Sequence, residues 1–246
     1  MSSVWIGTSG WSYKHWENGK FYPPKQPAKE RLAFYAQHFP TVEINYSYYQ
    51  LPPRSRFEAW RRDSPPGFVF AVKASRYLTH MKKLKDPEEP LQRLLQHAGG
   101  LGEKFGPVLF QFPRRWAVQV DRLAEFLQAL NEHPPHRYAF EFRHTSWLSP
   151  DVYALLRASN AALCLPVGWG IPLDVQQTSD WTYIRFHGGE HGIGFEDDEL
   201  APWAKRIRSW RDQGIDSYSY FNNDTLWHGR PAAIDDARRL REMVDA

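Results

Sequence analysis

Polar side chains recur at alternate positions within several short runs of β-forming residues. In Tyr138–Arg143, Glu141 and Arg143 share one face of an extended chain. The intervening Phe140 and Phe142 share the opposite face. Four further runs show the same separation of polar and apolar positions, with the charged or amide residues toward the end of the run. The polar positions found in this way are Glu43, Asn45, Lys73, Gln111, Glu141, Arg143, Arg185 and His187.

These residue types are suited to acid–base chemistry on an anionic molecule. We expect Glu43 or Glu141 to act as a general base, because a carboxylate can accept a proton from a reacting group. We expect Lys73 or His187 to act as an acid or an electrophile. The sequence thus favours an enzyme that acts on a small anionic, phosphate-bearing substrate, with phosphoester hydrolysis as the preferred reaction.

Further residues are candidates for holding that substrate. Arg143 and Arg185 have planar guanidinium groups that bind phosphate or carboxylate through two hydrogen bonds. Trp11 and Tyr13 follow the first β-rich run, where an exposed ring can stack on a ligand. We therefore predict a substrate-binding set of Trp11, Tyr13, Asn45, Gln111, Arg143, His144, Arg185, Asn222, Asn223 and Asp224.

The β-rich runs alternate with segments of helical period along most of the chain. The runs are Val4–Ser9, Thr41–Tyr46, Phe68–Ala74, Pro107–Phe112, Tyr138–Arg143, Ala161–Leu165, Thr182–His187 and Ser217–Asn222. The helical segments are Ala28–His38, Arg54–Arg62, Pro87–Gly99, Val118–Glu132, Pro150–Ala158, Asp197–Gln213 and Ala232–Val244.

Eight strands that alternate with helices predict an α/β fold, a single (β/α)8 TIM barrel over residues 1–246. Pro166–Asp180 has no helical period, so we expect the sixth helix to be short or replaced by a loop. An open doubly wound sheet is the alternative fold. In a barrel the strands end at one mouth, so the polar positions above would converge there.

A series of motifs resembles one known family from end to end. In order they are Ile6–Tyr13, Phe21–Pro24, Val42–Ser47, Phe70–Lys73, Leu109–Pro113, Phe140–His144, Ile184–Gly188 and Tyr220–Asp224. The sequence resembles the YecE-like family, domain of unknown function (DUF) 72. The resemblance implies a TIM barrel and brings no assigned activity. The chain departs from the family pattern at Ala162–Pro166, where the sixth strand usually ends in an acidic residue.

Other interpretations of the polar residues stay open. The charges could form a salt-bridge cluster that only fills the barrel. Glu43 and Glu141 could form the acid–base pair of a carbohydrate-active enzyme. Together with His187 and Asp224 they could also hold a divalent metal in an isomerase-like site. We do not favour a metal or any other cofactor, because lysine and arginine would compete for the same carboxylates.

A nucleic-acid-binding barrel without catalytic activity is the main alternative of another class. Lys82–Lys85 follows the third strand on the side of the mouth, where a basic loop can contact a phosphate backbone. Tyr46, Tyr48 and Tyr49 follow the second strand and can stack on bases.

Composition narrows the class of protein. The chain has 246 residues, 42% hydrophobic and 24% charged, with a formal net charge of +3, which is typical of a globular protein. No apolar run approaches the roughly 18 residues of a membrane helix, so we expect no membrane partner and a cytoplasmic location. The single cysteine, Cys164, excludes a disulfide within the chain and a cysteine-ligated zinc site. The sequence does not fix an oligomeric state.

Overall fold

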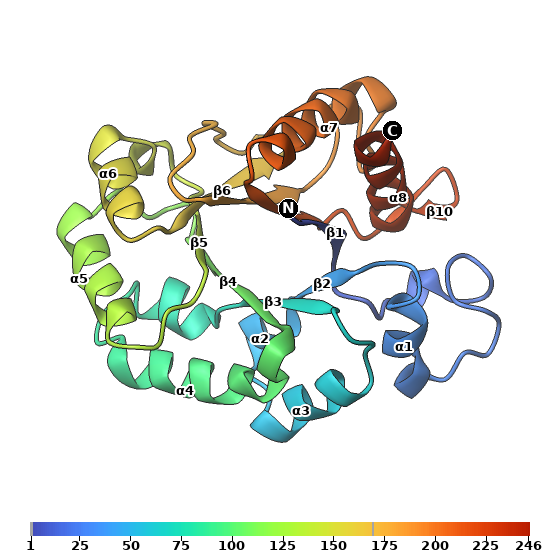
Figure 1. The fold of residues 1–246 in the computed structure, drawn as a ribbon, viewed down its shortest axis with the longest axis horizontal. Coiled ribbons are helices and arrows are strands. Elements are labelled where there is room, and N and C mark those ends of the chain that lie inside the picture. Colours follow the sequence, from blue (N-terminus) through green and yellow to red (C-terminus); the bar gives the residue numbers. More distant parts are fainter. Residues whose placement is uncertain (1, 169) are drawn as a thin grey trace.

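The computed structural model describes residues 2–168 and 170–246. Eight parallel strands pair in sequence order, and β8 pairs with β1 to close the barrel (Figure 1). This confirms the predicted (β/α)8 barrel. The strands are β1 (Val4–Ser9), β2 (Thr41–Ile44), β3 (Val69–Lys73), β4 (Phe105–Gln111), β5 (Tyr138–Glu141), β6 (Ala162–Val167), β7 (Trp181–Phe186) and β8 (Asp216–Phe221).

Helices surround the barrel (Figure 1). They are α1 (Arg31–Tyr35), α2 (Tyr46–Tyr49), α3 (Arg54–Arg62), α4 (Glu88–Ala98), α5 (Val120–Asn131), α6 (Pro150–Ala158), α7 (Asp197–Asp212) and α8 (Ala232–Asp245). Shorter helical turns are η1 (Lys14–Trp16), η2 (Ala28–Glu30), the π-helix η3 (Tyr77–Met81), η4 (Gly99–Lys104) and η5 (Thr145–Trp147). A small hairpin, β9 (Leu226–Trp227) and β10 (Arg230–Pro231), precedes α8. In the two described ranges, no helix has both the length and the apolar character needed to cross a bilayer.

The connection between β6 and β7 is a loop, as the sequence predicts. Residues 168 and 170–180 form no helix, and Trp169 lies outside the described residues. Thr178 fixes the loop to β6, because its Oγ1 accepts a hydrogen bond from the Leu163 N–H at 2.7 Å. The same hydroxyl donates to the Ala161 carbonyl oxygen at 2.7 Å.

The two faces of the strands have different environments. The outward apolar side chains pack with the helices in the main core, as Phe110 does against Phe126 of α5, with ring centroids 5.0 Å apart. The inward side chains form a second, separate cluster: Ala71, Leu109, Ala139, Ala162, Cys164, Trp181, Tyr183, Tyr218 and Tyr220. At the N-terminal end of the barrel, Trp5 stacks on Tyr218 at 4.4 Å. The alternation predicted from the sequence is therefore confirmed, and small and aromatic residues fill the barrel below the polar ones.

Two predicted elements differ from the structure. The strand predicted over Thr41–Tyr46 ends at Ile44, and Tyr46 begins α2. Ser47 explains the turn, because its Oγ is within hydrogen-bond distance of the Ile44 and Lys73 carbonyl oxygens, at 3.0 and 2.6 Å. The helix predicted over residues 28–38 is divided into η2 and the short α1. The other predicted bounds are within two residues of those observed.

Candidate active site

A buried arginine joins two glutamates at the C-terminal end of the barrel. Arg185 of β7 donates from Nη2 to Glu43 Oε1 at 2.9 Å and from Nη1 to Glu141 Oε2 at 2.6 Å. All three side chains are fully buried. Since Glu43 lies in β2 and Glu141 ends β5, one guanidinium group connects three strands. Its Nε has no hydrogen-bond partner among the described residues.

The Glu43 carboxylate is saturated with hydrogen bonds. Ser9 Oγ donates to Oε1 at 2.6 Å, and Tyr183 Oη donates to Oε2 at 2.7 Å. Burial by itself would raise the pKa of Glu43, but Arg185, Lys73 and the two hydroxyl donors lower it below its ordinary value. Glu43 is therefore ionised at neutral pH.

Glu141 is held in the same way. Arg143 Nε donates to Glu141 Oε1, and His187 Nε2 lies 3.4 Å from the same oxygen. Burial opposes ionisation, but Arg185 and Arg143 hold the pKa of Glu141 well below its ordinary value. Both glutamates are thus engaged in buried ion pairs. An ion pair would have to open before either of them could serve as the general base expected from the sequence.

His187 follows β7 and connects the arginines to two asparagines. Its Nε2 is 3.0 Å from Arg143 Nη2, and its Nδ1 is 3.2 Å from the side-chain nitrogen of Asn222. Asn45 Nδ2 in turn donates to Asn222 Oδ1 at 3.1 Å. Burial lowers the pKa of His187 to about 4 against the opposing effect of Glu141, so the ring is neutral at pH 7. We call Glu43, Glu141, Arg143, Arg185 and His187 the mouth network.

Lys73 lies beside the mouth network at the end of β3. The residue is 8% exposed, and Nζ lies 4.3 Å from the centroid of the Tyr48 ring. Within residues 2–168 and 170–246, Nζ forms no hydrogen bond and no ion pair, and it is not enclosed, so it has access to solvent at the mouth. Burial and the nearby Arg185 lower its pKa to about 8, although Glu43 and Glu141 favour the charged form. Lys73 is therefore the ionisable group of the site that changes protonation near neutral pH.

Three more predicted residues lie on the rim of the mouth. Tyr13 hydrogen-bonds to the Ser9 carbonyl oxygen. Burial raises the pKa of Tyr13, and the nearby carboxylates of Asp224 and Glu43 raise it further. Tyr13, which follows β1, and Asp224, which follows β8, are therefore neighbours on the rim. Gln111 ends β4 in register with Glu141 and is half-buried.

Other predicted substrate-binding residues have structural partners away from the mouth network. Trp11 packs edge-on against Trp60 of α3, with ring centroids 5.2 Å apart. His144 Nδ1 accepts a hydrogen bond from the Ser146 N–H at 3.2 Å and so caps η5.

The Asn223 side chain also points away from the mouth network, toward the helices that surround the barrel. Its Nδ2 donates to Asp236 Oδ2 of α8 and to the Ile193 carbonyl oxygen, both at 2.7 Å. Arg239 pairs with the same aspartate. Asn223 therefore ties the end of β8 to α8 and to the loop before α7.

Four residues outside the predicted catalytic and substrate-binding sets lie at or beside this site. Tyr183 and Ser9 donate to Glu43 from inward positions of β7 and β1. Tyr48 lies under the Lys73 ammonium group and packs against His80 of η3, with ring centroids 5.3 Å apart. A π-helix has no sequence signal of the kind that marks a strand face, so His80 could not have been placed in advance.

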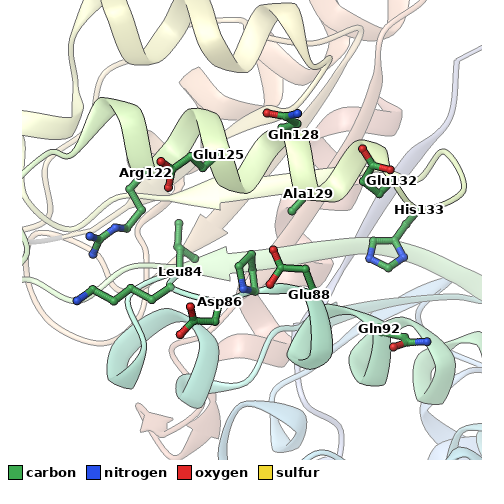
Figure 2. Close-up of a pocket in the computed structure, with 12 residues that line it drawn as sticks. Leu84, Asp86, Glu88, Gln92, Arg122, Glu125, Gln128, Ala129, Glu132 and His133 are labelled. Atoms are coloured by element: carbon green, nitrogen blue, oxygen red, sulfur yellow. The ribbon is translucent and has the colours of Figure 1, made fainter.

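Several cavities lie apart from the mouth network, and two of them are close to strand or helix ends that face solvent. An open groove of about 800 Å³ lies between the start of α4 and α5, and Glu88, Arg122, Glu125 and His133 are among its lining residues (Figure 2). A second cavity of about 550 Å³ lies beside the ends of β6 and β7 and the start of α7. No residue of the mouth network lines either of them.

Metal ligands do not gather in the described part of the chain. No group of three or more His, Cys, Asp or Glu side chains there could hold an ion. Of the four metal ligands considered from the sequence, Glu43, Glu141 and His187 are engaged with arginines, and Asp224 lies beside Tyr13.

Comparison with known proteins identifies relatives over the whole chain. Residues 5–246 match the family model described as protein of unknown function DUF72. The chain is 26% identical over 279 residues to the UPF0759 protein YunF of Bacillus subtilis (strain 168), covering 98% of this chain and 95% of that protein. It is 24% identical over 147 residues to the UPF0759 protein YecE of Escherichia coli (strain K12), covering 59% of this chain and 50% of that protein. A crystal structure of a DUF72 family protein from Thermotoga maritima is 29% identical, covers 99% of this chain and 100% of its own, and superposes with a TM-score of 0.82.

Proposed function

The chain belongs to the DUF72 family, and we propose that its barrel mouth is an enzyme active site for an anionic, phosphate-bearing small molecule. One observation carries the proposal. Three cationic side chains, Lys73, Arg143 and Arg185, are buried or nearly buried around the two carboxylates of the mouth network, while the carboxylate of Asp224 lies at the rim beside Tyr13. When Lys73 is protonated, the group has a positive charge in excess, which a bound anion would neutralise.

The donors that face this anion are Lys73 and Arg143. Lys73 Nζ has no partner among the described residues, whereas Arg143 uses Nε for Glu141 and Nη2 for His187. Arg143 Nη1 forms no hydrogen bond there and remains available. Arg185 is fully buried between the glutamates, so its role is to position them rather than to contact the ligand.

The acid–base group of this proposal is Lys73. For phosphoester hydrolysis, the reaction preferred from the sequence, its ammonium group would protonate the departing oxygen. Activation of water by Glu43 or Glu141 would require a buried ion pair to open. The geometry therefore supports anion binding more directly than hydrolysis. The carbohydrate-active and isomerase-like alternatives gain less support, because both need the same carboxylates unpaired.

Thermal unfolding with added anions tests the proposal. Inorganic phosphate and glycerol phosphate should raise the unfolding temperature of the wild-type protein, since a ligand that binds only the folded state stabilises it. Arg143→Met should weaken the binding at least about tenfold, a loss of about 1.4 kcal/mol. Arg62→Met, which removes an exposed arginine of α3, is the matched control and should bind as the wild type does. No stabilisation, or equal loss in both variants, would refute the proposal.

A second function, nucleic-acid binding, is favoured by a different observation. Four of the exposed large apolar side chains belong to α2 and η3: Tyr46, Tyr49, Tyr77 and Met81. We call them the tyrosine rim. The two helices are in contact, and Lys82 directly follows η3 with Nζ 5.9 Å from the Tyr77 ring centroid. Exposed rings beside basic side chains are typical of surfaces that bind single strands by stacking.

Fluorescence anisotropy separates this function from the first. Single-stranded DNA, intact duplex and abasic duplex are titrated at two salt concentrations, with Tyr49→Ala/Tyr77→Ala and Arg143→Met alongside the wild type. Binding that weakens with salt and is lost in the tyrosine variant, but not in Arg143→Met, would support the nucleic-acid function. No binding at low salt would exclude it.

A further inference from the structure

Lys73 is fixed in place through its backbone while its amine is left without a partner. The Lys73 carbonyl oxygen is 2.6 Å from Ser47 Oγ, and Lys73 pairs with Leu109 in the β3–β4 register. The residue is 8% exposed, and Tyr48 covers one side of Nζ at 4.3 Å from its ring centroid. The nearby carboxylates, Glu43 and Glu141, are already occupied by arginines and hydroxyl donors. The amine is thus held at the mouth without being neutralised there.

A second buried lysine, Lys104, has an amine whose hydrogen bonds are all satisfied by the protein. Lys104 is 5% exposed, and its Nζ donates to the Arg61 and Ser64 carbonyl oxygens, both at 2.6 Å, and to Ser64 Oγ at 3.0 Å. Three acceptors around one ammonium group are what a buried lysine needs for stability. Lys73 Nζ has none of them among the described residues and is not an enclosed atom, so its amine faces the opening of the mouth instead of being held by protein acceptors.

On the basis of the proposed function, we propose that the Lys73 amine is a nucleophile that forms an imine with the carbonyl group of an anionic aldehyde or ketone. The ligand's anionic group would bind Arg143, while its carbonyl carbon faces Nζ. Lysine amines in apolar pockets or beside other cations are suited to this reaction, because both features favour the neutral amine.

The step balances without an oxidant or a reductant. Neutral Nζ attacks the carbonyl carbon, a C–N bond forms as the C–O π bond breaks, and one Nζ proton moves to the oxygen to make a hydroxyl group. That hydroxyl group takes the second Nζ proton and leaves as water, which breaks the C–O bond and leaves the imine. At pH 7.5, a pKa of about 8 leaves roughly a quarter of the Lys73 side chains neutral, against roughly one in a thousand for an ordinary lysine.

Reductive trapping tests this inference. The wild-type protein is incubated at pH 7.5 with pyridoxal 5′-phosphate, an aldehyde with a phosphate group, and then treated with sodium borohydride. The borohydride delivers a hydride to the imine carbon, and peptide mass mapping locates the resulting amine. We expect Lys73 to be labelled at least about tenfold faster than exposed lysines such as Lys29, and Lys104 to remain unlabelled.

Variants and a second probe separate this inference from the proposed function. Lys73→Arg keeps the charge but cannot form an imine, so it should lose the fast label, whereas Lys29→Arg should keep it. Pyridoxal, which lacks the phosphate, should label Lys73 more slowly; equal rates would support the imine but count against phosphate binding at the mouth. If inorganic phosphate stabilises the protein through Arg143 while Lys73 is labelled no faster than Lys29, the imine is refuted and the proposed function stands. The mapping on wild-type protein decides the question even if a variant does not fold.

Discussion

Removal of the Arg185 guanidinium should reveal how strongly the barrel interior depends on it. In Arg185→Met, Glu43 loses the arginine that pairs with it, whereas Glu141 keeps Arg143. All of the lost contacts are between fully buried side chains, at 2.9 and 2.6 Å. Removing one partner of a buried ion pair costs about 3–5 kcal/mol, because the remaining charge has no compensation. We expect a loss of that size in the free energy of unfolding at pH 7.5.

The loss should depend on pH, because the Glu43 pKa is shifted in opposite directions in the wild type and in Arg185→Met. In the wild type its folded pKa is lowered, so its contribution to stability is present above the unfolded value and is lost as pH falls through the folded one. Without Arg185, burial, which is the largest single effect on the Glu43 pKa, should outweigh Lys73 and the two hydroxyl donors and raise the folded pKa above the unfolded value. The contribution of Glu43 is then present at low pH and lost as pH rises. Arg185→Met should therefore be less destabilised at pH 5 than at pH 7.5.

Urea unfolding followed by tryptophan fluorescence measures both effects. The control is Arg54→Met, which breaks the exposed Arg54–Glu58 pair of α3 and should cost no more than about 1 kcal/mol at either pH. Glu43→Gln/Arg185→Met should recover part of the stability at pH 7.5, since the buried charge is gone. If Arg185→Met loses under about 1 kcal/mol, or loses the same amount at both pH values, the electrostatic account of the mouth network is wrong.

Three further predictions concern other parts of the molecule. The affinity for glycerol phosphate, measured by calorimetry, should fall as pH rises through about 8, because Lys73 loses its charge there; constant affinity from pH 7.5 to 9.5 would contradict this. Asp236→Ala should lose about 1–3 kcal/mol in urea unfolding, because the buried Phe195 N–H and the Asn223 side-chain amide both lose the carboxylate that accepts from them, while anion binding stays unchanged. Gly7→Ala should lose roughly 2 kcal/mol or more, since the added methyl group would lie 2.2 Å from the Thr41 carbonyl oxygen; unchanged thermal unfolding would show that β1 can shift.

The strand faces could be predicted from the sequence because alternation is a local property. The alternation of side chains within each run is enough to place Glu43, Lys73, Glu141 and Arg185 on the inward face of the strands. The barrel then brings them together at its C-terminal end. Their partners could not be predicted in this way. Arg185 and Glu43 are 142 positions apart, and only the closed register of β2, β5 and β7 places one guanidinium between two carboxylates.

Residues beyond the strand ends were less predictable. Asn223 follows β8 but turns to Asp236 in α8, and His144 follows the inward-facing Arg143 but caps η5. Side chains no longer alternate between two faces once the backbone leaves the extended conformation. The same limit explains Tyr46, which the alternation places in a strand and the structure places in α2.

A crystal structure of the protein with bound glycerol phosphate tests the central claim most directly. The account predicts a phosphate group within hydrogen-bond distance of both Lys73 Nζ and Arg143, with the Arg185 ion pairs intact. A phosphate seated only in the groove between α4 and α5, or on the tyrosine rim, would contradict the claim that the barrel mouth is the anion site.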